Sequence, residues 1–162
     1  MTVSVGDRIP ASKLVHMTDN GPEDINIADR IAGKRVVLFG LPGAYTRTCS
    51  AAHLPSFLRT ANAFREKGID EIICFAVNDV FVMNHWGESS GANEAGIVML
   101  ADWDAELTKA LGLDFTAPPV GLKDRTTRCA MLVEDGVVKV LQIEEDSGTC
   151  NVTAGETLLE LT

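Results

Sequence analysis

Short apolar runs alternate along this chain with segments of helical periodicity, and that alternation limits the fold more than any other feature. The apolar runs are continuous and aliphatic, as expected for strands buried on both faces, and occupy residues 34–41, 71–78 and 96–102. Helices are expected where apolar side chains recur at helical spacing, at 54–67, around 80–93 and at 105–113. Strands and helices that alternate in this way form a parallel α/β core.

The last part of the chain adds a hairpin and a closing helix. Residues 128–144 predict two strands joined at an Asp-Gly turn, which is a strong hairpin signal. Residues 153–161 predict an amphipathic helix, with Thr153 as its N-cap and Glu156 completing a capping box. The whole order is β-α-β-α-β-α-β-β-α. It predicts one α/β domain over residues 1–162, with a mixed central sheet and helices on both faces, in a thioredoxin-like arrangement.

Charge and hydropathy exclude several kinds of partner. The 162 residues carry 14 Lys and Arg against 23 Asp and Glu, a net charge of −9, and the basic residues form no run. We therefore expect no binding to nucleic acid or to anionic membranes. No apolar run has the length of a membrane span, and the N-terminal residues show no secretory signal.

The cysteines indicate a compartment and argue against a metal. Four cysteines in a chain with no visible leader favour a reducing compartment, and we expect the cytoplasm. An organellar protein that has lost its targeting segment would begin in the same way. The cysteines form no closely spaced pair, and the three histidines form no ligand pattern with them, so a zinc site is not expected.

One cysteine lies where thiol chemistry is expected. The stretch PGAYTRTCS, residues 42–50, follows the first strand and places Cys49 in the first turn of the next helix. Backbone N–H groups and the helix dipole stabilise an anion there, so a thiolate needs no neighbouring histidine. Thr46 can turn its hydroxyl toward the sulfur, Arg47 adds a cation, and Pro55 predicts a kink or break about one turn later. A small buried hydrophobe is the alternative interpretation of Cys49, but its polar neighbours favour a reactive thiol.

Several blocks of the sequence resemble one family. The spacing Pro42-x-x-x-Thr46-x-x-Cys49 resembles the active-site loop of the peroxiredoxins, and FGLPGAYTRTCSAAHLPSF is similar to the subfamily called peroxiredoxin five or type II. The likeness continues in order through residues 75–87, 98–104 and 128–145 and so covers most of the chain. It implies thiol-dependent reduction of hydrogen peroxide or alkyl hydroperoxides, with no metal or organic cofactor.

The resemblance implies roles for four side chains. Cys49 matches the peroxidatic cysteine, whose thiolate attacks the terminal peroxide oxygen and becomes a sulfenic acid. Thr46 matches the hydroxyl that orients the peroxide. Arg128 matches the arginine that holds the thiolate and the peroxide oxygens, and Pro42 matches the residue that shields the sulfur from water. Arg125 is a rival for Arg128, and a strand arginine on a solvated face is the alternative interpretation of Arg128.

A sulfenic acid needs a second thiol to be recycled. Cys150 lies in a polar loop before the last helix, resembles the resolving position of the animal-type members, and is expected to be accessible and mobile. Cys74 lies inside a predicted strand, at a position where plant-type members carry a cysteine. We rank Cys150 first, an external thiol (thioredoxin, glutaredoxin or glutathione) second, and Cys74 third.

The remaining expectations concern the pocket, the assembly and an alternative function. Arg47 stands where proline is common in the family, and Cys129 stands where an aromatic residue is common and is expected to pack in a strand. Phe115 and Leu122 are expected to line the pocket mouth, and the resemblance suggests a homodimer. A redox-sensing interaction module that uses the same thiol is the alternative function. A thioredoxin-type disulfide oxidoreductase is disfavoured, because position 46 holds threonine where a C-x-x-C pair needs cysteine.

Overall fold

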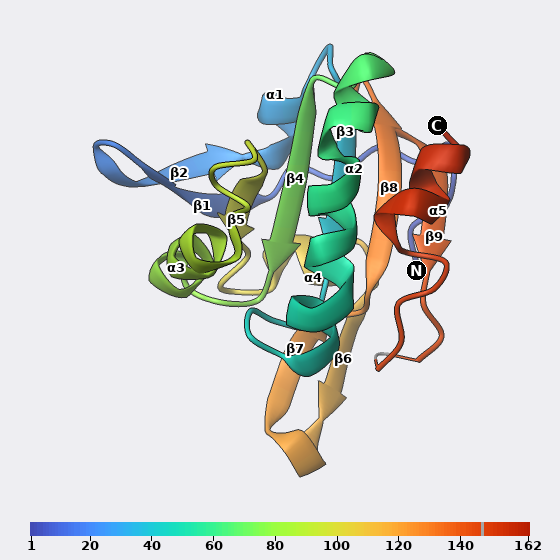
Figure 1. Ribbon diagram of the computed structural model, residues 1–162. Helices are drawn as coiled ribbons and strands as arrows, with labels where there is room; N and C mark the ends of the chain where they lie inside the picture. The colour runs from blue at the N-terminus through green and yellow to red at the C-terminus, as the bar shows by residue number, and fades with distance from the viewer. Residues whose placement is uncertain (147) are drawn as a thin grey trace.

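A seven-stranded mixed sheet forms the centre of the computed structural model, which describes residues 1–146 and 148–162 (Figure 1). The strands lie in the order β2-β1-β5-β4-β3-β8-β9. Their bounds are β1 Lys13–Thr18, β2 Gly21–Asn26, β3 Arg35–Gly40, β4 Glu71–Ala76, β5 Val98–Ala101, β8 Cys129–Glu134 and β9 Val137–Ile143. The three central strands β3, β4 and β5 run parallel, and the outer strands pair antiparallel on both sides.

Helices cover both faces of this sheet. On one face lie α2 (Leu54–Glu66), α3 (Val80–Ser90) and α5 (Gly155–Glu160), and on the other lie α1 (Ile27–Ile31) and α4 (Glu106–Ala110) (Figure 1). Successive residues of β3 alternate between the two cores, with Val37 and Phe39 on the α2 side and Val36 and Leu38 on the α1 side. The predicted mixed sheet with helices on both faces is confirmed.

The register of β3 and β8 brings distant parts of the sequence together. These strands are antiparallel neighbours, and Gly40 at the end of β3 pairs with Cys129 at the start of β8. Arg128 comes directly before β8, so it lies beside the loop that follows β3. Because Cys49 follows that same loop, the sheet brings Cys49 and Arg128 to the same end of β3.

The sequence pattern misses two hairpins and a short helix. The β1–β2 hairpin and α1 precede the first predicted strand. A two-stranded sheet of β6 (Asp114–Ala117) and β7 (Leu122–Thr126), with the 3₁₀ turn η2 (Pro118–Val120), extends from the body of the protein (Figure 1). The strands β2, β6 and β7 carry many polar residues, so they lack the apolar alternation by which a strand is recognised.

The predicted capping box at the last helix is wrong. The N-cap of α5 is Ala154, which makes no side-chain cap bond. The Thr153 hydroxyl instead donates to Glu144 Oε2 over 2.6 Å, and Glu156 forms an ion pair with Arg59. The Asp-Gly turn of the β8–β9 hairpin is present as predicted, with φ of 46° at Asp135 and 78° at Gly136.

Candidate active site

The helix that follows β3 begins with a turn wider than an α-helix. Helical backbone starts at Arg47, residues Cys49–His53 form the π-helical turn η1, and regular α2 begins at Leu54. The Leu54 N–H donates to the Cys49 carbonyl, which is a π-type bond. Pro55 accounts for the change, because it has no N–H for the carbonyl four residues earlier and its ring crowds that carbonyl. The sequence predicts a kink or break at this point, and the structure shows a change from π-helical to α-helical backbone within a continuous helix.

Cys49 and Arg128 meet in the interior. Arg128 Nη2 donates to Cys49 Sγ over 3.4 Å, and the two residues are 1% and 0% exposed. The interpretation of Arg128 as a strand arginine on a solvated face is therefore wrong. Cys49 is buried, as the alternative interpretation of it as a small buried hydrophobe predicts. Its sulfur nevertheless faces a guanidinium as well as the apolar core.

The loop between β3 and the helix is held by side chains from three parts of the chain. Its bonds run from Thr46 Oγ1 to the Gly43 carbonyl (2.8 Å), from the Ala44 N–H to Asn78 Oδ1 (2.8 Å) and from Arg125 Nη1 to the Pro42 carbonyl (2.9 Å). Arg125, the rival of Arg128 in the sequence, thus supports the loop rather than facing the sulfur.

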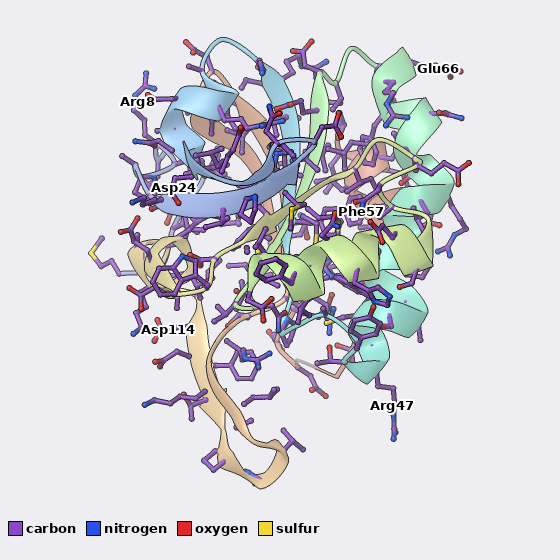
Figure 2. All side chains as sticks on the ribbon, turned by 90° about the vertical axis from the view of Figure 1, so that its left-hand side faces the viewer. Arg8, Asp24, Arg47, Phe57, Glu66 and Asp114 are labelled. Carbon is purple, nitrogen blue, oxygen red and sulfur yellow. The ribbon has the colours of Figure 1, made fainter. Side chains whose placement is uncertain are left out.

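A pocket of about 590 Å³ opens at this loop. It is lined by Pro42, Thr46, Arg47, Thr48, Val120, Leu122, Arg128 and Gly148. The structure therefore brings Pro42, Thr46, Arg128 and Leu122 together at one pocket. Phe115 is not among the lining residues and lies on β6 opposite Arg125. Figure 2 shows the Arg47 side chain at the start of the helix, pointing away from the body of the protein.

The segment that carries Cys150 is fastened to the start of the same helix. Thr48 Oγ1 donates to the Gly148 carbonyl over 2.8 Å, and the His53 ring bonds the Thr153 carbonyl over 3.1 Å. Cys150 lies between these two points in sequence and is half-buried, so it is less accessible than the sequence analysis expected. Burial raises the pKa of the Cys150 thiol, and the Thr153 hydroxyl and the charge of Arg128 oppose that shift.

Glu144 organises the Cys150 segment through its carboxylate. Its oxygens accept hydrogen bonds from the N–H groups of Asn151, Val152 and Thr153 and from the Thr153 hydroxyl. Burial would raise the pKa of Glu144, but these hydrogen bonds outweigh it and lower the pKa below the ordinary value. The ionised carboxylate therefore stabilises the folded segment.

Replacing Glu144 by glutamine should lower stability in a pH-dependent way. A carboxylate that accepts several hydrogen bonds contributes about 1–3 kcal/mol, which corresponds to a loss of several degrees in Tm at neutral pH. Because the pKa is lowered in the folded state, this stabilisation is complete above the ordinary value of 4.5 and is lost as the pH falls below it. Thermal unfolding of wild type and Glu144→Gln should thus differ at neutral pH and converge in acid. Glu145→Gln, at the exposed neighbouring position, is the control, and an equal difference at every pH would contradict the role given to the carboxylate.

The two remaining cysteines are buried in strands. Cys74 on β4 and Cys129 on β8 are both 0% exposed. Burial, with the neighbouring thiols of Cys49 and Cys129, raises the pKa of Cys74 well above its usual range. Burial raises the pKa of Cys129 to about 12. Cys129 packs in its strand as expected, and Cys74 would need a large movement to reach solvent.

His53 is the residue at this site that the sequence analysis did not select. Its side chain is 0% exposed and bonds Arg128 as well as Thr153. The sequence contains one signal for it, because residues four apart on a helix share a face and His53 is four residues after Cys49.

The part of the chain that the structure describes holds neither a metal-ligand cluster nor a membrane-spanning helix. Across residues 1–146 and 148–162, no three His, Cys, Asp or Glu side chains gather in a way that could hold a metal ion. Within the same ranges, no helix is both long enough and apolar enough to cross a membrane.

The chain is similar to several known proteins. The Redoxin family model matches residues 4–159. The protein named Peroxiredoxin-2E-2, chloroplastic, from Oryza sativa subsp. japonica is 43% identical over 164 residues, covering 99% of this chain and 73% of that protein. Peroxiredoxin-2D from Arabidopsis thaliana is 38% identical, covering 98% of this chain and 97% of that protein. This chain belongs to the peroxiredoxin family.

A solved structure agrees with this assignment. The crystal structure of reduced Prx3 in complex with H₂O₂ from Vibrio vulnificus is 40% identical to this peroxiredoxin, with a TM-score of 0.93 and coverage of 99% of both chains. The predicted thioredoxin-like fold and the resemblance to type II peroxiredoxins are therefore confirmed. The chain is a thiol-dependent peroxidase, which uses a peroxide substrate and a thiol reductant, and the redox-sensing module is not favoured.

Proposed function

We propose that Cys49 is the peroxidatic residue of this peroxiredoxin, and the bond from Arg128 to the Cys49 sulfur carries the proposal. The Cys49 thiolate attacks the terminal oxygen of a hydroperoxide with a sulfur electron pair. The S–O bond forms as the O–O bond breaks, and Cys49 becomes a sulfenic acid. The released oxyanion takes up a proton and leaves as an alcohol, or as water when the substrate is hydrogen peroxide.

The neighbours of Cys49 have roles in this step that follow from their contacts. Negative charge moves from the sulfur to the leaving oxygen, and the Arg128 guanidinium lies where it can stabilise both. The Thr46 hydroxyl donates a hydrogen bond to the Gly43 carbonyl. Its oxygen can therefore accept a hydrogen bond from the O–H of the incoming hydroperoxide. Pro42, which lines the pocket, keeps water from the sulfur.

The pocket supports small hydroperoxides as substrates. Its lining combines polar groups near Cys49 with the apolar side chains of Val120 and Leu122 from the β6–β7 hairpin. The polar end suits hydrogen peroxide, and the apolar wall suits a short alkyl group. We therefore propose hydrogen peroxide and alkyl hydroperoxides as the substrate class.

Cys150 is the resolving thiol that we propose. Its thiol attacks the Cys49 sulfenic acid, an S–S bond forms, and the oxygen leaves as water. The two bonds that fasten the Cys150 segment to the helix start support this choice, since they hold it beside the turn that carries Cys49. Reduction by thioredoxin, glutaredoxin or glutathione would return both thiols. Cys74 keeps the third rank because it is enclosed in β4.

Trapping the oxidised protein tests the choice of Cys150. One equivalent of hydrogen peroxide is added to reduced protein, remaining thiols are blocked, and disulfides are mapped by mass spectrometry. We expect a Cys49–Cys150 peptide in wild type and in Cys74→Ala, and no such peptide in Cys150→Ser. Wild-type protein that stops at the Cys49 sulfenic acid would contradict an intramolecular disulfide and favour an external thiol.

We also propose a homodimer that works in a reducing compartment. Tyr45 in the active-site loop and Phe81 at the start of α3 are 53% and 66% exposed, which supports apolar contacts near the site. The cytoplasm is the proposed location, and an organelle is the alternative because the Oryza sativa relative is named chloroplastic. Analytical ultracentrifugation tests the dimer, and a monomer at micromolar concentration would contradict it.

A further inference from the structure

A buried histidine lies between the arginine and the C-terminal segment. His53 ends the π-helical turn that begins at Cys49, and its side chain is 0% exposed. Arg128 Nη1 lies 3.0 Å from His53 Nδ1, and His53 Nε2 lies 3.1 Å from the Thr153 carbonyl oxygen. The Arg128 guanidinium therefore contacts the Cys49 sulfur through one nitrogen and His53 through another.

These partners define the protonation of the ring. A carbonyl oxygen only accepts, so His53 Nε2 carries the proton that it donates to Thr153. A guanidinium only donates, so Nδ1 must be unprotonated to accept from Arg128. Burial and the positive charge of Arg128 lower the pKa of His53 to about 3, in agreement with a neutral ring. An imidazolium would place two donors face to face and repel Arg128.

We propose that His53 is a positioning residue, which holds the Arg128 guanidinium against the Cys49 sulfur and fastens the Cys150 segment to the start of the helix. The inference rests on the proposed role of Cys49 and adds a residue to it. An arginine side chain has many rotamers, and a fixed acceptor at Nη1 leaves Nη2 directed at the sulfur. Donors held in place before the reaction need no reorganisation as charge moves to the leaving oxygen.

The surroundings of His53 keep its ring in one orientation. The Phe39 and Phe57 rings lie 5.3 Å and 5.6 Å from it, centroid to centroid, and pack against it at steep angles. The position of Arg128 thus depends on a ring that is fixed by the core on one side and by the Thr153 carbonyl on the other.

The same contacts couple the two thiols. A Cys49–Cys150 disulfide requires close Cα atoms, and Cys49 is fully buried in its π-helical turn, so we expect that turn to rearrange when the disulfide forms. Because His53 belongs to that turn, unwinding it would break the bonds to Arg128 and to Thr153 together. The contact between His53 and Arg128 would then last only while Cys49 is in the arrangement that attacks peroxide.

Two variants of His53 separate its two bonds. In His53→Asn the amide oxygen reaches the place of Nδ1 and can still accept from Arg128. In His53→Gln the amide nitrogen reaches the place of Nε2 and can still donate to Thr153, but the acceptor for Arg128 is lost. We expect His53→Gln to slow the second-order reaction of Cys49 with hydrogen peroxide by roughly 10- to 100-fold, as misplacement of a catalytic donor does, and His53→Asn to stay within about threefold of wild type.

A double-mutant cycle shows whether His53 acts through Arg128. In an Arg128→Lys background, replacing His53 by Gln should cost much less than in wild type, because the group that it positions is already gone. Equal losses in His53→Asn and His53→Gln, or losses that multiply with Arg128→Lys, would overturn the proposal.

A measurement on the unaltered protein complements the variants. Nitrogen-15 NMR of the histidine side chains should show His53 as the neutral ring protonated at Nε2, from neutral pH down to about pH 5. A ring protonated at Nδ1, or an imidazolium in that range, would overturn the inference even if a variant fails to fold.

If wild-type Cys49 reacts with peroxide no faster than an ordinary thiol, the proposed function fails as well. If wild type is fast and His53→Gln equals it, only this inference fails.

Discussion

Replacing Cys49 by serine should lower peroxide consumption at least ~10³-fold, since removal of the nucleophile from a covalent mechanism costs several orders of magnitude. A serine hydroxyl stays protonated at neutral pH, and the neighbouring histidine, His53, is not placed to remove its proton. His53 Nδ1 is occupied by Arg128, and its Nε2 donates to Thr153. Consumption of hydrogen peroxide with a dithiol donor measures the effect.

The matched control for this prediction is Cys150→Ser, the same substitution at the proposed resolving thiol. It should keep the first step and consume one equivalent of peroxide, while continued turnover with thioredoxin should fall. Cys49→Ser should not consume even the one equivalent of peroxide that the first step requires. Turnover that survives in Cys49→Ser would show that another thiol is the nucleophile.

Arg128→Lys should slow the reaction of Cys49 with hydrogen peroxide by about 10²- to 10³-fold, the usual cost of removing one donor that stabilises charge in the transition state. Lysine keeps a positive charge but not the planar fork, so it cannot face both the Cys49 sulfur and His53. Stopped-flow measurement of sulfenic acid formation gives the rate. Thermal unfolding shows whether the buried substitution has disturbed the fold.

Two other arginines serve as comparisons. Arg8→Lys, at a side chain far from Arg47 in Figure 2, should leave the rate unchanged. Arg125→Lys should cost less than Arg128→Lys, because Arg125 contacts the Pro42 carbonyl and supports the loop only. A larger loss in Arg125→Lys would transfer the role in charge stabilisation to that residue.

The centre of the fold could be predicted from the sequence because its signals are local. The strands β3, β4 and β5 are continuous apolar runs, and α2 ends where a basic residue and Gly68, with φ of 86°, follow it. The position of Cys49 in the first helical turn follows from the same alternation. Its contact with Arg128 depends instead on the pairing of β3 with β8, and the resemblance to a family supplied that pair.

Other features depend on contacts between distant residues and could not be predicted. Thr153 stands at the position expected for an N-cap. Its hydroxyl instead donates a hydrogen bond to Glu144, the residue that directly follows β9. The role of His53 depends on Arg128 and Thr153, which bond the two nitrogens of its ring. Phe115 and Leu122 were both expected at the pocket mouth, and only Leu122 is among its lining residues. For Thr153 and His53, a tertiary partner that is absent from the local pattern decides the role of the side chain.

The central claim is that Cys49 is the thiol that peroxide oxidises, and it can be tested by trapping. Fully reduced protein is mixed with one equivalent of hydrogen peroxide in the presence of a sulfenic acid reagent, and adducts at all four cysteines are quantified by mass spectrometry. We predict that the adduct forms at Cys49 first, and in Cys150→Ser almost entirely there. An adduct that appears first at Cys74, Cys129 or Cys150, with Cys49 still reduced, would contradict the account.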